Sequence, residues 1–351
     1  MSSGRAILLT PPGAAAIAVV RLAGPGVAAF LNDHFAGKPA EGRCVHGNIT
    51  DGDRIIDDAV VVAALSEGFA DISMHGGPWV VRSMLELAGR CGFEVMETMP
   101  LEDIDAPTLL EREVLAHLPL ARTELALRTL LAQPHAWRAL LADDAHRAGR
   151  IASILGDRSL HWLLHPPRVA IIGTANVGKS TLANQLFAQE RSITADLPGT
   201  TRDWVGEIAN LDGLAVMLID TPGQRQSDDP IERLSIERSG RQIAAADLVV
   251  LVLDPTQPLA PEQYHLLDAH PASLRILNKS DRPPLWGNFT IGAIPTVATT
   301  GQGVEQLRAA IRRHFDCEAI EPDSPRWWTP RQQRLLTEAA ADPDVIRAMV
   351  Q

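Results

Sequence analysis

The residues of this sequence with the clearest chemical potential form a glycine-rich run at 173–180, which fits the spacing G-x-x-x-x-G-K-[ST]. The run follows an apolar stretch typical of a strand and precedes a leucine pattern typical of a helix. Glycines at this spacing let successive backbone N–H groups surround phosphate oxygens at a helix N-terminus, which favours anions. A chance glycine turn is the alternative, and the strand–loop–helix context disfavours it. The predicted phosphate-binding residues are Gly173, Asn176, Val177, Gly178, Lys179, Ser180 and Thr181.

Within this run, we expect Lys179 to reach the β- and γ-phosphates during catalysis and the Ser180 hydroxyl to ligate Mg²⁺. A second motif, Asp220-Thr221-Pro222-Gly223, follows another apolar run. There Asp220 would hold Mg²⁺ through a water and the Gly223 N–H would sense the γ-phosphate. By itself this turn is an ordinary end of a strand. Its distance from Lys179 leaves room for a helix, a switch loop and two strands, which favours the nucleotide role.

A third motif, Asn278-Lys279-Ser280-Asp281, follows an apolar run at 274–277. The Asp281 carboxylate can accept the N1–H and 2-amino hydrogens of guanine, a donor pair that adenine lacks, so such a site discriminates strongly. Asn278 would tie this loop to the phosphate loop, and the Lys279 stem would cover the base. The motifs in this order predict a GTP-binding domain and disfavour an ATPase.

A softer signal lies at 297–303, between a short strand and a helix. We expect the Ala298 N–H to donate to guanine O6, with Thr299 beside it in the site. Without the preceding motifs, a plain loop would explain this segment nearly as well.

The segment 198–203 supplies candidates for the first switch. A threonine hydroxyl there completes the coordination of Mg²⁺ when the γ-phosphate is bound, and we predict Thr201 for this role in preference to its neighbour Thr200. Hydrolysis also needs a group that positions water. Gln224, directly after the Asp-x-x-Gly turn, is one candidate.

The elements that must position these residues change character along the chain. Residues 167–316 alternate apolar, β-branched runs with helix-length segments, which predicts a doubly wound α/β domain with a mostly parallel sheet. Residues 1–105 show apolar runs separated by Gly/Pro turns and predict an α+β domain. Residues 106–166 predict helices interrupted at Pro119, and 317–351 a helical segment packed on them.

Composition narrows the class further. The 351 residues suggest two or three domains, and their formal net charge of −11 disfavours a protein that binds nucleic acid mainly by neutralising phosphates. The sequence shows no secretory leader and no long apolar run, so we expect a cytoplasmic protein that makes no contact with membranes. The three cysteines lie far apart, which excludes a disulfide framework and a cysteine zinc site and fits a reducing compartment.

Together these motifs resemble the MnmE (TrmE) family of tRNA-modification GTPases. The resemblance implies that Glu232 orients the attacking water through a bridging water, and that Arg225 is the family's switch arginine. It also implies that Asn176 coordinates K⁺, which stimulates hydrolysis, and that two G domains dimerise in a homodimer. Side-chain chemistry alone allows Asn176 a loop-capping role equally well. Glu232 and Gln224 both stay open as the water-orienting residue.

The resemblance extends to the N-terminal region, through the segments 10–13, 17–25 and 75–78. It implies an N-terminal domain that binds a formyl-tetrahydrofolate-type one-carbon donor. Arg21 matches a folate-binding position, and Asp71 falls where a glutamate is expected. On physical grounds alone, Arg21 would be a solvated charge at the end of a strand.

Several family segments have no counterpart in this sequence. Ala14-Ala15-Ala16 replace a glycine-rich stretch, the region after residue 95 lacks the family's folate-binding lysine, and the helical region is short. No C-x-G-K motif ends the chain, whose length is less than we expect of a full-length member. We expect Cys317 to be a buried, unreactive thiol.

The resemblance therefore implies a shortened GTPase that binds GTP, GDP and Mg²⁺ and acts in tRNA wobble-uridine modification with an MnmG-type flavoprotein partner. Because of the acidic charge, we expect tRNA to be met only through that partner. One alternative is a regulatory GTP switch that binds a partner and modifies nothing. Another is an Era- or EngA-like ribosome-assembly GTPase, although such proteins carry a basic RNA-binding module that this sequence lacks.

Overall fold

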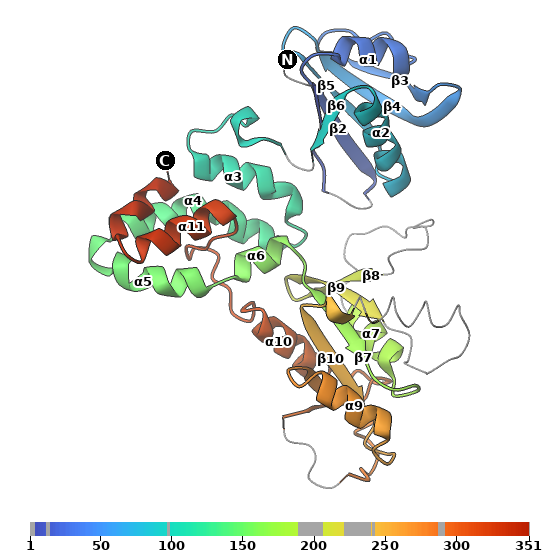
Figure 1. Ribbon diagram of the computed structural model, residues 1–351, viewed down its shortest axis with the longest axis vertical. Helices are drawn as coiled ribbons and strands as arrows, with labels where there is room; N and C mark the ends of the chain where they lie inside the picture. The colour runs from blue at the N-terminus through green and yellow to red at the C-terminus, as the bar shows by residue number, and fades with distance from the viewer. Residues whose placement is uncertain are drawn as a thin grey trace. The chain divides into compact units, whose positions relative to one another are not determined.

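The computed structural model describes residues 4–11, 15–96, 99–188, 206–220, 240, 243–286 and 292–350 (Figure 1). Its contacts divide the chain into two compact units, built mainly from residues 4–121 and 122–347, which are described separately. Among the helices of these described segments, none is long and apolar enough to cross a bilayer.

The first unit is built on a six-stranded sheet with the order β3-β4-β5-β2-β1-β6, in which only β1 and β6 pair in parallel. The strands are β1 (Gly4–Leu8), β2 (Ile17–Ala23), β3 (Cys44–Asp51), β4 (Arg54–Ala64), β5 (Phe69–His75) and β6 (Phe93–Met96). Helices α1 (Val27–His34) and α2 (Pro78–Arg90) contribute to one core with the strand residues Val20, Val61 and Ile72, which are fully buried. Because side chains alternate along a strand, Arg21 and Asp71 stand on the other face.

Three short helical elements complete this unit: η1 (Leu101–Asp103), α3 (Leu109–His117) and η2 (Leu118–Leu120). A capping box opens α3, since the Thr108 hydroxyl accepts from the Glu111 N–H at 3.2 Å and the Glu111 carboxylate accepts from the Thr108 N–H at 3.2 Å. The helix ends before Pro119, which has no N–H to continue it. The predicted interruption is confirmed.

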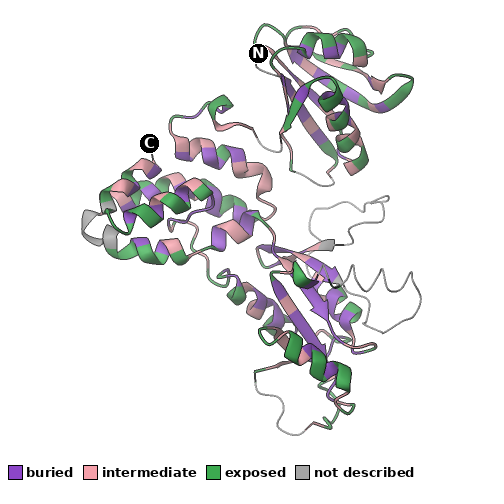
Figure 2. Ribbon diagram, in the orientation of Figure 1, coloured by how far each residue is buried: buried purple, intermediate pink, exposed green. Residues whose placement is uncertain are grey.

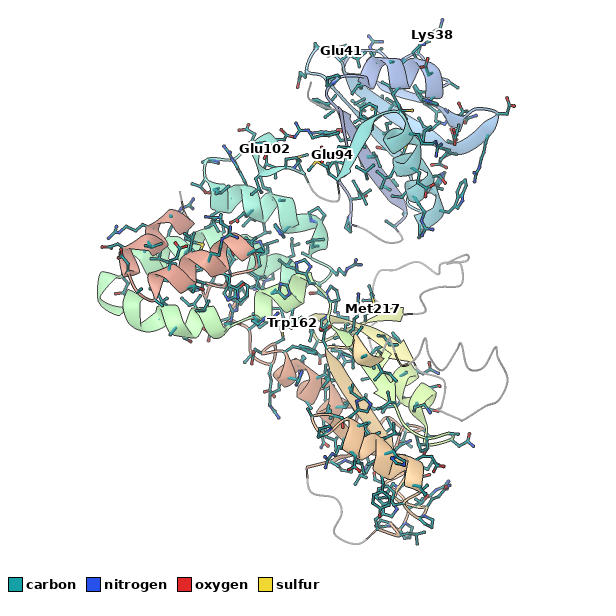
Figure 3. The ribbon with its side chains drawn as sticks, in the orientation of Figure 1. Lys38, Glu41, Glu94, Glu102, Trp162 and Met217 are labelled. Atoms are coloured by element: carbon teal, nitrogen blue, oxygen red, sulfur yellow. The ribbon has the colours of Figure 1, made fainter. Side chains whose placement is uncertain are left out.

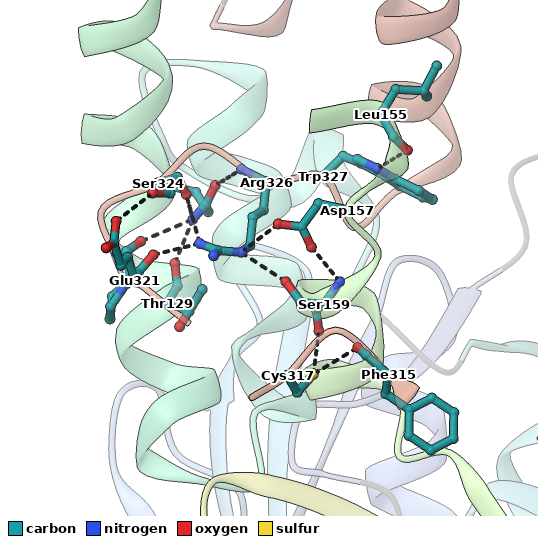
Figure 4. Close-up of polar contacts among 12 residues, drawn as sticks. Thr129, Leu155, Asp157, Ser159, Phe315, Cys317, Glu321, Ser324, Arg326 and Trp327 are labelled. Atoms are coloured by element: carbon teal, nitrogen blue, oxygen red, sulfur yellow. Dashed lines mark hydrogen bonds and ion pairs between the residues drawn. The ribbon is translucent and has the colours of Figure 1, made fainter. Parts of the chain in front are cut away.

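The second unit contains the helices α4 (Glu124–Ala142), α5 (Asp144–Gly156), α6 (Ser159–Leu164) and α11 (Pro330–Ala339), with η3 (Pro343–Met349) following α11. The buried Arg326 holds the segment before α11 against α6 (Figure 4). Its Nε donates to Ser159 Oγ at 2.9 Å and lies 3.1 Å from Asp157 Oδ2, and its carbonyl accepts from Trp137 Nε1 at 3.0 Å.

The same unit contains a second six-stranded sheet, with the order β12-β11-β10-β7-β9-β8. Its elements are β7 (Arg168–Ile172), α7 (Lys179–Ala188), β8 (Gly206–Leu211), β9 (Leu214–Asp220), β10 (Leu248–Leu253), α9 (Pro261–Ala269), β11 (Leu274–Leu277), β12 (Ile294–Pro295) and α10 (Val304–His314). All pairs are parallel except β8 with β9. The central strands β7 and β10 are almost wholly buried (Figure 2), as continuous apolar runs in a parallel sheet must be. The predicted α/β fold is confirmed.

Three contacts join the helical part of this unit to the part that contains its sheet. The Thr123 hydroxyl, which caps α4, donates to the carbonyl of Gly213 at 2.6 Å in the β8–β9 turn. Gly213 has a φ of 101°, and a Cβ there would lie 2.6 Å from Leu125. The ring centroid of Trp162, in α6, lies 5.1 Å from that of Phe315, and the Met217 N–H of β9 donates to the carbonyl of Pro167. Figure 3 labels Trp162 and Met217.

Candidate nucleotide-binding site

The predicted phosphate loop connects β7 to α7, so its backbone N–H groups lie at the N-terminus of a helix. Gly173 and Gly178 have φ values of 153° and 98°. A Cβ on Gly173 would overlap the carbonyl of Val252, and one on Gly178 would overlap the side-chain amide of Asn278. The two glycines are therefore required by close packing against the neighbouring strand and loop.

Lys179 is 7% exposed, and its ammonium lies inside this loop, donating to the carbonyl of Thr174 at 2.8 Å. Ser180 and Thr181, in the first turn of α7, are exposed. The loop thus combines a held ammonium, helix N–H groups and exposed hydroxyls. This is the chemistry that a phosphate and a hard cation require.

Asn278 joins the phosphate loop to the two other loops at this edge. It is 2% exposed, and its Nδ2 donates to the carbonyl of Val177 at 2.7 Å. Its Oδ1 accepts the Ala298 N–H at 2.9 Å. The Ala298 N–H was predicted to donate to guanine O6. In the structure it donates to Asn278, and Ala298 is 3% exposed. Thr299 beside it is exposed.

The next residues of this loop differ in burial. The Lys279 ammonium donates to the Asn176 carbonyl at 3.0 Å and to Asp254 Oδ2 at 2.6 Å. Asp281 is exposed, so its carboxylate is accessible to a ligand. The loop is anchored through Asn278 and Lys279 and presents Asp281 outward.

Strand order brings these groups together. The strands β11, β10, β7 and β9 are neighbours and parallel, so their carboxyl ends lie at one edge of the sheet. The guanine-type loop follows β11, the phosphate loop follows β7, and Asp220 ends β9 beside Ile171. Ligand sites of parallel sheets form at this edge, next to a reversal of strand order.

The predicted switch residues are not all described. Thr200, Thr201, Gly223, Gln224, Arg225 and Glu232 lie outside the described residues, and Asp220 is described by its backbone alone. Their assigned roles stay predictions.

In the first unit, Arg21 and Asp71 pair with one another across β2 and β5. The guanidinium donates from Nε to Oδ1 at 2.7 Å and from Nη2 to Oδ2 at 2.8 Å, and it lies 4.3 Å from the Phe69 ring centroid. The hydrogen bond with Asp71 raises the pKa of Arg21 above its usual value. The expectation of a solvated charge at a strand end is wrong, because Arg21 lies within β2 opposite a carboxylate.

Comparison with known proteins matches both units. The family described as "GTP-binding protein TrmE N-terminus" matches residues 6–97, and the family described as "50S ribosome-binding GTPase" matches residues 168–279. The tRNA modification GTPase MnmE of Chloroflexus aurantiacus is 32% identical, over 81% of this chain and 74% of the relative. The chain belongs to the MnmE family. The MnmE proteins of Thermotoga maritima and Thermus thermophilus are each 30% identical, covering 94% and 87% of this chain and 86% and 81% of their own.

Membership of the MnmE family confirms the resemblance drawn from the motifs. The chain is a GTP-binding enzyme that hydrolyses GTP, with GTP, GDP and Mg²⁺ as its ligands. It also sets aside the Era- or EngA-like alternative. One alignment, with the MnmE of a Roseiflexus species, runs over 405 residues while covering 95% of this chain, so that relative carries internal segments that the 351 residues lack.

The described residues fit a magnesium nucleotide. The exposed hydroxyl of Ser180 and the backbone position of Asp220 lie at the same sheet edge, where hard oxygen ligands are needed. Asn176 is exposed on the phosphate loop with a φ of 63°, and its carbonyl accepts from Lys279.

A formyl-tetrahydrofolate fits less well. A cavity of about 470 Å³ in the first unit is lined by Arg21, Thr10, Asp103, Asp105 and apolar side chains. Among its described lining residues the cation is Arg21, already paired with Asp71; Asp103 is paired with Arg5 at 2.9 Å, and Asp105 adds a negative charge. Because the cation among these lining residues is already paired, the wall attracts the anionic tail of a folate only weakly.

One residue of this site was missed by the sequence analysis. Asp254 follows β10 directly, as Asn278 follows β11, and Asp220 is the last residue of β9. A polar residue at the carboxyl end of a central parallel strand was the available signal. Cys317, by contrast, is buried as predicted, and burial raises the pKa of its thiol to about 12.

Proposed function

We propose that this enzyme reads guanine through Asp281, holds the phosphates with Lys179 and the loop around it, and acts in tRNA wobble-uridine modification. The observation that carries the guanine assignment is the anchoring of its loop. Asn278 bonds the phosphate loop at 2.7 Å, and Lys279 bonds it at 3.0 Å, while Asp281 stays exposed. An exposed carboxylate on a loop anchored at these two residues suits the paired donors of guanine.

The roles of the remaining residues follow the family pattern. Ser180, Thr201 and Asp220 serve Mg²⁺, with Thr200, Gly223 and Thr299 among the nucleotide contacts. The Ala298 N–H, which donates to Asn278 in this structure, would reach guanine O6 only by leaving that partner. Asn176 binds K⁺, Arg225 belongs to the second switch, and Glu232 or Gln224 orients water. The same proposal includes a homodimer, an MnmG-type partner and a cytoplasmic location. It also divides the chain into four parts, at 1–105, 106–166, 167–316 and 317–351. Arg21 and Asp71 stay as the proposed folate contacts, and no step is routed through a folate.

The guanine assignment is tested by Asp281→Asn. An amide at this position donates where the carboxylate accepts, so we expect preference to move from GTP toward XTP, whose base carries an oxygen in place of the 2-amino group. Competition against a fluorescent GDP analogue measures the two affinities. Asp268→Asn, the same change at an exposed carboxylate on α9, is the matched control. An unchanged preference for GTP in a folded Asp281→Asn protein would contradict the assignment.

A regulatory switch without modification activity is the second candidate. Two observations favour it. The relative has internal segments that this chain lacks, and Arg21 in the cavity wall is already paired with Asp71. In this case GTP binding and hydrolysis persist, while no modified uridine is formed.

A further inference from the structure

Asp254 occupies a central place at the edge of the sheet where the nucleotide loops meet. It follows β10, the strand between β7, which leads to the phosphate loop, and β11, which leads to the guanine-type loop. The residue is 2% exposed. A buried carboxylate is unfavourable unless it is paired and hydrogen-bonded, so its contacts define what holds it there.

Both oxygens of this carboxylate are engaged. Oδ2 accepts from the Lys279 ammonium at 2.6 Å, and Oδ1 accepts from the Thr256 N–H at 3.0 Å and from the Thr256 hydroxyl at 2.6 Å. Burial alone would raise the pKa of Asp254, but the bonds from Lys279 and Thr256 outweigh it and hold the pKa below its usual value. The group is therefore an anion at neutral pH.

The ammonium held by Asp254 spans two loops. Besides Asp254, it bonds the carbonyl of Asn176, in the phosphate loop, at 3.0 Å. Asn176 and Lys279 have φ values of 63° and 61°, a region that residues other than glycine rarely adopt without support. The Asp254–Lys279–Asn176 chain of contacts supplies that support to both loops at once.

Other residues of the guanine-type loop bond the backbone on both sides of Asp254. Asn278 donates its N–H to Leu253 at 2.9 Å, Leu285 donates its N–H to Pro255 at 2.7 Å, and Trp286 donates from Nε1 to the carbonyl of Gln257. The segment 253–257 thus accepts hydrogen bonds from residues that precede and follow Asp281 in the chain.

We propose that Asp254 is a positioning residue for guanine recognition, acting through Lys279 to hold the guanine-type loop against the phosphate loop. It touches no nucleotide itself. The inference rests on the proposed guanine site. It adds that the affinity and base selectivity of that site depend on the Asp254 carboxylate at the end of β10, the strand next to β11.

The central experiment uses the full chain and Asp254→Asn, which keeps the shape and removes the charge. We expect the fluorescent analogue mant-GDP to dissociate about tenfold faster, as the loss of a charge-assisted hydrogen bond predicts. We also expect the ratio of affinities for GTP and ITP, which lacks the 2-amino group, to decrease. The matched control is Asp212→Asn, which removes a carboxylate paired with Arg308 at 2.7 Å in the same sheet domain, and should leave release unchanged.

A double-mutant cycle separates positioning from general damage. If Asp254 acts through Lys279, then Asp254→Asn adds no further acceleration to a Lys279→Met protein. An equal acceleration in both backgrounds, or wild-type release by a folded Asp254→Asn protein, overturns the inference. Should Asp254→Asn not fold, Thr256→Val removes one bond to the carboxylate and should speed release about threefold; unchanged release there also overturns it. Asp281→Asn distinguishes the two failures, because it tests the guanine site without Asp254.

Discussion

Gly178 shows how closely the residues of this site depend on one another. The space that its missing Cβ leaves is occupied by the side-chain amide of Asn278, which bonds Val177 at 2.7 Å. The glycine therefore serves the guanine-type loop as well as the phosphates. A side chain at Gly178 would push away the residue that joins the two loops.

Asn176 carries the prediction about the monovalent cation. If its side chain ligates K⁺, which offsets charge developing on the phosphates, hydrolysis should be about tenfold faster in KCl than in NaCl at equal ionic strength. Asn176→Ala should remove most of this difference, whereas Asn184→Ala, an exposed position on α7, should keep it. Phosphate release under saturating GTP measures both. Equal rates in the two salts would remove the assignment.

His161 carries a prediction about pH. Its ring lies 4.7 Å from His165 and 5.2 Å from Trp162, and burial, followed by repulsion from His165 and Arg158, lowers its pKa to about 4. The unfolded state, with an ordinary histidine pKa of about 6.5, binds a proton more readily than the folded state. Stability is therefore fully present above about pH 6.5 and decreases as pH falls toward 4.

His161→Phe keeps an aromatic ring and removes this titration. We expect the Tm of the variant, measured by circular dichroism, to decrease less between pH 7 and pH 4.5 than the Tm of the parent protein. His265→Gln, at an exposed histidine on α9, should behave as the parent does. Identical pH profiles for the parent and His161→Phe would contradict this account.

At the scale of elements, the segment 317–329 binds the helices that precede the GTPase sheet to those that follow it. Arg326 is 6% exposed, and in addition to Ser159 and Asp157 it bonds the carbonyl of Glu321 at 2.6 Å (Figure 4). Trp327 donates from Nε1 to Leu155 at 3.1 Å. The bonds from Arg326 to Ser159 and from Trp327 to Leu155 join residues more than 150 positions apart, so they form only when both flanks of the domain are present.

Arg326→Ala should lower the free energy of unfolding by about 3 kcal/mol, because it leaves a partly buried carboxylate and several carbonyls without their donor. Urea unfolding followed by tryptophan fluorescence measures the change. Arg128→Ala, which removes an exposed pair with Glu124, should change it by less than about 0.5 kcal/mol. A comparable loss in both variants would show that the buried position of Arg326 is unimportant.

At the scale of the whole molecule, the question is whether GTP hydrolysis is coupled to tRNA modification. The proposed function is tested by expressing the chain in cells that lack their own MnmE and measuring wobble uridines by mass spectrometry. If the chain modifies tRNA, we expect the modified nucleoside to return, and Asp281→Asn not to restore it. Absence of the nucleoside, with GTP hydrolysis intact in the purified protein, would favour the regulatory switch.

The sequence by itself determined the elements and the chemistry of the site, because both depend on local patterns. The glycine spacing at 173–180, the apolar runs of β7 and β10, and the break before Pro119 each follow from backbone rules that act within a few residues. The family could be identified from the same short motifs.

Only the tertiary structure decided which distant residues meet. Arg21 faces Asp71 because β2 pairs with β5, and Asp254 meets Lys279 because β10 lies between β7 and β11. The Ala298 N–H was predicted to face a ligand, and in the folded chain it donates to Asn278. Sequence patterns report the burial and direction of single elements, whereas strand order and register set the contacts among them. For this reason the phosphate loop could be predicted from the sequence. The role of the Asp254 carboxylate, which holds Lys279 in the neighbouring guanine-type loop, could not.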